Sequence, residues 1–183
     1  MMNSNSDHDR HDFEKLRRWH EELVDIDHAI FNYCSVFIVT ETDTAAQDIF
    51  RVYRTAFEGM GAKFANLVIF GQHGFSATAK ALLRTFHSES FSLPMFLVMD
   101  WSNLSGCYQI DLPSGNGDQI DLTILSEKVL SMIETSLNFP NQFVRMGDIA
   151  GVRKIDTNIL SLVDSVSEII TNVSIRPVDP GQD

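Results

Sequence analysis

The sequence predicts an α/β protein with a mixed sheet, for three reasons. Residues 34–39 and 66–70 are short, nearly continuous apolar runs, which is typical of strands covered on both faces. Each run is followed by a helical pattern, and two such strand–helix units make their strands parallel. Two later runs, 94–100 and 107–112, are joined by a short turn-rich link, which makes this last pair antiparallel.

The two later strands are distinguished by proline and by alternation. Pro94 opens the first of them, one of the few positions where a strand tolerates proline. Residues 107–112 alternate between apolar and polar side chains with a period of two. This alternation predicts the outer strand of a hairpin.

Five helices are predicted from apolar residues that recur at helical spacing. They cover approximately residues 12–28, 44–60, 77–87, 123–137 and 157–170. Thr42 or Asp43 is expected to cap the second helix and Ser76 the third, because short polar side chains accept hydrogen bonds from free backbone N–H groups. Gly59 and Gly61 provide the end of the second helix.

These elements divide the chain into four parts. Residues 1–11 are polar and are predicted to be a disordered tail. Residues 12–138 form the main domain, and residues 139–176 form a C-terminal extension that is irregular or weakly extended over residues 139–153 and then helical. Residues 177–183 are predicted to be a second disordered tail.

Charge and composition limit what the chain is expected to bind. The formal net charge is −11, so the clustered basic side chains that neutralise phosphates are not available for nucleic-acid binding. The same charge disfavours anionic membranes, and no apolar run approaches the roughly 20 residues that span a bilayer. The first residues lack the basic and apolar regions of a signal peptide. We therefore expect a cytoplasmic protein without nucleic-acid or membrane partners.

The residues that usually carry chemistry do not form a recognisable set. Cys34 and Cys107 lie in predicted strands and are interpreted as buried core residues, and no Cys-x-x-Cys pair is present. His20 and His28 could share a helix face, but no third ligand completes a zinc set. The glycine spacing of a phosphate loop and the nucleophile elbow are also missing. The sequence thus predicts no metal, no cofactor and no catalytic residue; it leaves enzymatic activity open but favours a non-enzymatic role.

The order strand, helix, strand, helix, strand, strand, helix resembles the thioredoxin fold. The resemblance is sharpest at Leu-Pro-Met-Phe-Leu-Val, residues 93–98, because in that family a cis proline precedes the third core strand and faces the active-site turn. It covers about residues 12–137. The resemblance implies a three-layer α/β/α domain with a mixed sheet, to which an N-terminal helix and a C-terminal helical extension are added.

The chain departs from that family in the turn after the first strand. The family carries Cys-x-x-Cys there, at a helix N-terminus that lowers the thiol pKa so that the thiolate attacks disulfides. Here the turn reads Glu41-Thr42-Asp43-Thr44, whose side chains cannot perform that exchange. Cys34 is at the other end of the strand, roughly 15 Å away. We therefore expect a member without a redox centre.

A second family resemblance remains open at this point. Residues 35–40 followed by an acidic turn are also similar to the opening of flavodoxin-like and TIR-like domains. Those folds continue with more parallel strands. An open parallel sheet with a nucleotide or small-molecule site is therefore the alternative, both for the fold and for the function.

The leading hypothesis is a redox-inactive thioredoxin-like protein that acts by binding another protein, in an accessory, assembly or chaperone-like role. In this topology the first turn and the proline loop converge, so a partner peptide can pair there. The expected binding surface, here named the rim, consists of Thr40, Glu41, Thr42, Asp43, Thr44, Gln72, His73, Leu93 and Pro94. The last helix is expected to pack on its own domain, with a homodimer through that helix as the alternative. A thiol enzyme that uses Cys34 or Cys107 is the third hypothesis.

Overall fold

The structure of the protein is a computed structural model, and it describes most of the predicted elements. It describes residues 4–24, 33–59, 64–71, 75–85, 93–101, 104, 106–112, 127–128, 130–135 and 148–174. The helices are α1 (Ser4–Val24), α2 (Thr44–Gly59), α3 (Ala77–Thr85) and α5 (Ile159–Ser174), and residues 127–128 and 130–135 are also helical. The strands are β1 (Tyr33–Thr40), β2 (Phe64–Gly71), β3 (Met95–Asp100), β4 (Gly106–Asp111) and β5 (Val152–Ile155).

The five described strands form one mixed sheet in the order β2-β1-β3-β4-β5. β1 and β2 are parallel, with Val36 opposite Leu67. β3 runs antiparallel to β1, β4 antiparallel to β3, and β5 antiparallel to β4. The chain is thus an α/β protein with a mixed sheet, and the alternative of an open, all-parallel sheet is wrong. The link between β3 and β4 is too short for a crossover connection, so β4 must run opposite to β3. A sheet whose strands are all parallel is therefore excluded.

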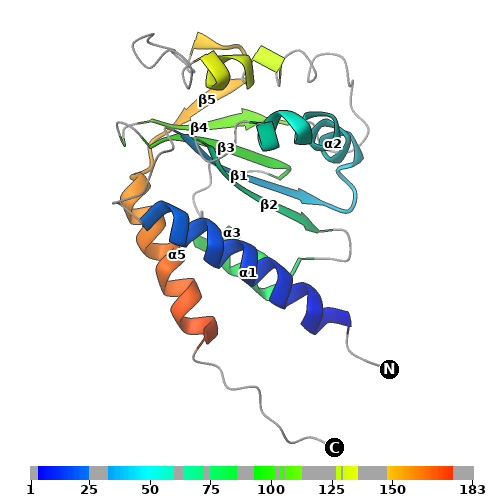
Figure 1. Cartoon of the computed structure of the whole chain (residues 1–183), viewed down its shortest axis with the longest axis vertical. Coiled ribbons are helices and arrows are strands. Elements are labelled where there is room, and N and C mark those ends of the chain that lie inside the picture. The colour runs from blue at the N-terminus through cyan, green and yellow to red at the C-terminus, as the bar shows by residue number, and fades with distance from the viewer. Residues whose placement is uncertain are drawn as a thin grey trace, which may run out of the picture.

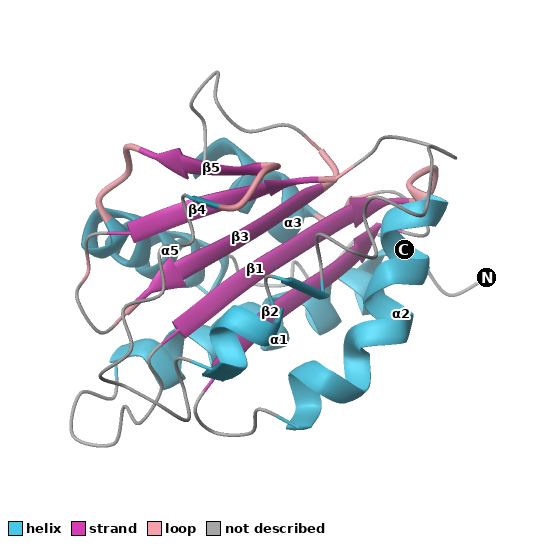
Figure 2. Cartoon of the chain, turned by 90° about the horizontal axis from the view of Figure 1, so that it is seen from above, coloured by secondary structure: helices cyan, strands magenta, loops and turns pink. Residues whose placement is uncertain are grey.

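Helices cover both faces of this sheet (Figures 1 and 2). α1, α3 and α5 lie on one face, and α2 lies on the other together with the helical residues around 127–135. Because both faces are covered, all residues of β1 except the last are buried, as its continuous apolar pattern predicts. Side chains of alternating residues of β1 therefore enter two different cores.

The core under α1, α3 and α5 is aliphatic, and the core under α2 is aromatic. The first contains Val36 and Leu97 of the sheet together with Trp19 of α1 and Val166 of α5. In the second, the ring centroid of Phe37 lies 5.3 Å from that of Phe50 and 5.4 Å from that of Phe96. The spacing of these rings suits tilted and edge-to-face packing.

The C-terminal segment differs most from the prediction. Residues 139–153 are predicted to be irregular or weakly extended, but residues 152–155 form a regular strand, β5, which pairs with β4 through Cys107 and Ile155. β4 is therefore an interior strand and not the outer strand of a hairpin. The pattern concealed β5 because Arg153 and Lys154 are exposed and the strand is only 4 residues long.

α5 packs on the domain that carries it. Leu162, Val163 and Val166 are buried in the aliphatic core, as expected for a helix that covers its own sheet. Leu160, which helical spacing predicts on the same stripe, is 50% exposed. The chain itself thus covers most of this stripe, and the homodimer through α5 stays a prediction.

Two helix boundaries lie at the residues predicted to cap or end those helices, whereas α1 begins earlier than its apolar pattern predicts. α1 begins at Ser4, so the residues from there to His11, expected to be disordered, are helical; no glycine or proline interrupts this polar stretch. Ser76 caps α3 as predicted, because its Oγ accepts a hydrogen bond from the Ala79 N–H at 3.0 Å. α2 ends at Gly59, the first of the two glycines expected to end it.

Candidate functional site

The turn between β1 and α2 is held by its own side chains. The Asp43 carboxylate accepts hydrogen bonds from the Thr40 backbone N–H at 2.8 Å and from the Thr40 hydroxyl at 2.7 Å. The Thr40 and Thr42 hydroxyl oxygens lie 2.9 Å apart, and the Asp43 N–H donates to the Thr40 carbonyl at 3.3 Å. Asp43 directly precedes α2, and its carbonyl accepts from the Gln47 N–H, so it occupies the capping position. These bonds fix the conformation of the turn without a ligand.

The same bonds decide which rim residues face solvent. Glu41, Thr42 and Thr44 are exposed, whereas Asp43 is only 5% exposed and its carboxylate points back into the turn. Asp43 is therefore a structural residue of the turn: it holds the capping position expected of it, but its carboxylate accepts hydrogen bonds from Thr40 and not from the N–H groups of α2. The outward surface is formed by Glu41, Thr42 and Thr44.

One residue of this turn escaped the sequence analysis. Gln47 is 6% exposed, and its Nε2 donates a hydrogen bond of 2.6 Å to the Thr40 carbonyl. It ties the first turn of α2 to the last residue of β1. A polar residue on the buried side of an otherwise apolar helix was the available signal, because a buried amide requires a hydrogen-bond partner.

Two more rim residues, Leu93 and Pro94, lie at the same end of the sheet. Met95 pairs with Ile38, so Pro94 and Leu93 come level with the last residues of β1. Pro94 is buried, Leu93 is half-buried, and the peptide bond between them is cis, the isomer that the thioredoxin resemblance implies at this position. Gly71 pairs with Thr40, but Gln72 and His73, which follow it, lie outside the described residues.

Both cysteines are buried in the aliphatic core, far from this turn. Cys34 pairs with Met99, and Met99 pairs with Cys107, so the two thiols are separated by one intervening strand. Two strand spacings are about 9.6 Å, whereas disulfide Cα atoms lie roughly 4.4–6.8 Å apart. Burial raises the pKa of Cys107 to about 12, and burial raises that of Cys34 as well. Neither environment produces a reactive thiolate.

A buried polar cluster joins α1 to α3. The Ser76 hydroxyl donates a hydrogen bond of 2.7 Å to an oxygen of Asp12, which is 9% exposed. The ammonium nitrogen of Lys15 lies 4.0 Å from the other Asp12 oxygen and donates to the Val68 carbonyl at 3.2 Å. The Ser76 oxygen also accepts a hydrogen bond from the Ala79 N–H. The hydroxyl thus donates to α1 and accepts from α3, and both bonds stabilise the fold. Sequence reasoning missed this cluster because 64 positions separate Asp12 from Ser76.

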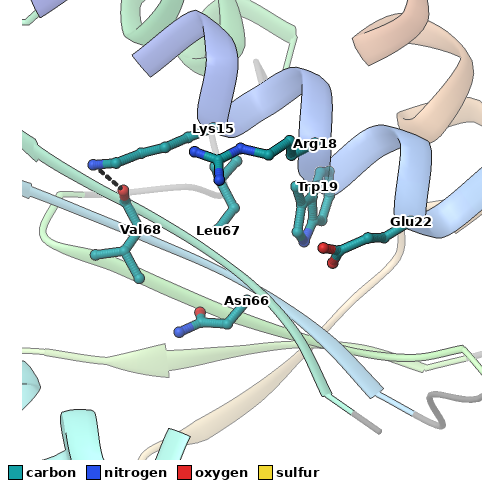
Figure 3. A pocket seen from close by; sticks show the side chains of 7 residues that line it. All are labelled: Lys15, Arg18, Trp19, Glu22, Asn66, Leu67 and Val68. Carbon is teal, nitrogen blue, oxygen red and sulfur yellow. Dashed lines mark hydrogen bonds between the residues drawn. The ribbon is translucent and has the colours of Figure 1, made fainter. Parts of the chain in front are cut away.

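A groove runs between α1 and the outer edge of β2, and we call it the α1–β2 groove (Figure 3). Its lining residues are Lys15, Arg18, Trp19, Glu22, Asn66, Leu67 and Val68. The cavity volume is about 260 Å³, slightly below the range of roughly 300–1,000 Å³ that holds cofactors and drug-sized ligands. Its size therefore suits side chains of a protein surface better than a dinucleotide or flavin.

Two other kinds of feature are missing from the described part of the chain. No group of three or more His, Cys, Asp or Glu residues there could hold a metal ion. No helix in that part is long and apolar enough to pass through a lipid bilayer.

Comparison with known proteins gives no family for this chain. No protein-family model matches the sequence, and no curated protein is significantly similar to it. Its function must therefore be inferred from its own residues.

Proposed function

We propose that this chain is a redox-inactive, thioredoxin-like cytoplasmic protein that acts by binding another protein at the rim. The supporting strand pattern is a parallel pair, β1 and β2, followed by the antiparallel strands β3 and β4. This pattern is the one that the thioredoxin resemblance implies for residues 12–137.

The proposal depends mainly on one observation at the turn after β1. Where the redox members carry reactive thiols, this chain presents the exposed side chains of Glu41, Thr42 and Thr44 on a turn fixed by internal hydrogen bonds. A fixed turn binds with a smaller entropy cost than a flexible one. Because this end of the sheet has no reactive thiol, we assign it the binding of another protein.

The test compares rim variants with a matched control in affinity purification from the native cell. Glu41→Lys combined with Thr44→Lys alters two exposed rim positions, and Glu58→Lys reverses one exposed acidic residue, which pairs with Arg54, at the far end of α2. We expect the rim variant to lose a partner that the wild type and Glu58→Lys both retain. Equal recovery of every partner by all three proteins would refute the assignment of the rim.

The redox part of the proposal is tested separately. Purified protein is expected to leave insulin unreduced in the presence of dithiothreitol, at the rate of the protein-free control. Reduction above that rate would refute a redox-inactive role, whatever the rim variants show.

A further inference from the structure

The α1–β2 groove presents opposite charges in a defined order. Its four residues from α1 are 15, 18, 19 and 22, a spacing of i, i+3, i+4 and i+7 that places them on one side of the helix. Lys15 and Arg18 precede Trp19 in this series, and Glu22 follows it. Figure 3 shows Arg18 and Glu22 on opposite sides of the Trp19 ring, both beside β2.

The two charged groups next to Trp19 do not form an ion pair with each other. Arg18 and Glu22 are four positions apart, a spacing that commonly gives an ion pair on a helix. Arg18 instead donates a hydrogen bond from its Nε to the Glu14 carbonyl. Burial raises the pKa of Glu22 and the nearby Arg18 charge partly offsets this, but Glu22 forms no ion pair or hydrogen bond within the described residues. Arg17, on the same helix, pairs with both Glu14 and Glu21. The groove therefore keeps a positive and a negative group available to a second molecule.

The base of the groove is an edge strand. β2 has 8 residues and is the outermost strand on its side of the sheet. Trp19 donates its indole N–H to the Ala65 carbonyl at 3.4 Å, and Lys15 donates to the Val68 carbonyl. These bonds tie α1 to β2, so that charged side chains of α1 stand beside this edge of the sheet. Recognition at this groove is then carried by its side chains.

We propose that the α1–β2 groove is the interface of a homodimer in which the α1 helices of two copies lie antiparallel about a two-fold axis near Trp19. Such an axis places Arg18 of each copy against Glu22 of the other, while Lys15 keeps its contacts with Asp12 and the Val68 carbonyl. A two-fold interface must be complementary to itself, and the order positive, tryptophan, negative at residues 18, 19 and 22 has this property. The proposal uses other residues than the rim, so it stands or fails independently of the proposed function.

The test exploits the two-fold symmetry through charge reversal. Wild-type protein is expected to show a concentration-dependent dimer in sedimentation velocity. Arg18→Glu and Glu22→Arg should each raise the dimer dissociation constant by at least about tenfold, because every reversal creates two like-charge contacts. Arg51→Glu, on exposed α2, makes the same charge change outside the groove and should leave the dimer intact.

Mixing the two single variants separates a second copy from any other occupant. In the mixture, one contact pairs the new carboxylate at position 18 with the new guanidinium at position 22, and the other pairs the native Arg18 with the native Glu22. A heterodimer should therefore form at concentrations where each variant alone is monomeric. The double variant Arg18→Glu/Glu22→Arg should also recover the homodimer.

Two results would overturn the proposal. One is a wild-type protein that stays monomeric up to near-millimolar concentration. The other is a mixture of the two single variants that stays monomeric. Circular dichroism of each variant checks that it is folded, so that a lost dimer is not mistaken for a lost fold.

Discussion

Replacing Asp12 with alanine is expected to destabilise the protein by about 2–3 kcal/mol. The Asp12 carboxylate accepts a hydrogen bond of 2.7 Å from the Ser76 hydroxyl; Asp12 is 9% exposed and Ser76 is half-buried. Hydrogen bonds to charged groups contribute roughly 1.5–3 kcal/mol when they are made inside a protein. The nearby Lys15 ammonium, which lies 4.0 Å from the carboxylate, would also lose its counter-charge.

The assay is chemical and thermal unfolding of wild type, Asp12→Ala, Ser76→Ala and the double variant. For a chain of this length, about 2–3 kcal/mol corresponds to a fall in melting temperature of roughly 4–12 °C. Because the two side chains are in direct contact, the double variant should cost about 1–2 kcal/mol less than the sum of the single variants. Asp12→Asn keeps an acceptor oxygen but loses the charge, so it should fall between wild type and Asp12→Ala.

Two outcomes would refute this reasoning. An Asp12→Ala variant within about 0.5 kcal/mol of wild type would behave as an ordinary surface substitution. Single costs that simply add in the double variant would mean that the Asp12–Ser76 contact contributes nothing of its own.

Three further predictions concern buried groups. Burial lowers the pKa of His20 from its ordinary value of 6.5, partly offset by a backbone carbonyl of α5, so the unfolded chain takes up this proton at higher pH than the folded chain. Stability should therefore be full above about pH 6.5 and fall as the pH drops below it, and His20→Gln should flatten this slope in pH-dependent urea unfolding. Cys34 and Cys107 should react with a thiol reagent only at the rate of unfolding, so rapid labelling of the native protein would contradict their burial. Gln47→Ala should cost about 1–2 kcal/mol in urea unfolding, because it removes a buried hydrogen bond to the end of β1, whereas the exposed Asp48→Ala should cost under about 0.5 kcal/mol.

The elements that the sequence predicts correctly are those whose residue pattern reflects their own burial. β1 and β3 are covered on both faces, so their continuous apolar runs reveal them directly. Ser76 was identifiable as a cap because a cap acts within three residues of its own position. Local signals of this kind need no knowledge of the rest of the chain.

The features that sequence reasoning missed depend on distant partners. β5 has exposed charges at two of its 4 positions and is a strand only because β4 offers it an edge. The Asp12–Ser76 contact joins two helices that have no relation in sequence. The capping position of Asp43 was predictable, but the return of its carboxylate to Thr40, which removes it from the outer surface of the rim, was not.

The late position of β5 and α5 in the chain has a consequence during synthesis. The aliphatic core needs Ile155, Ile159 and Val166, which leave the ribosome only after the other four strands have been translated. Until then β4 presents an open edge and one face of the sheet stays partly bare, which is the kind of surface that self-associates. The nascent protein thus passes through a vulnerable interval that ends only when its last helix docks, and a ribosome stalled before residue 152 would hold it in that state.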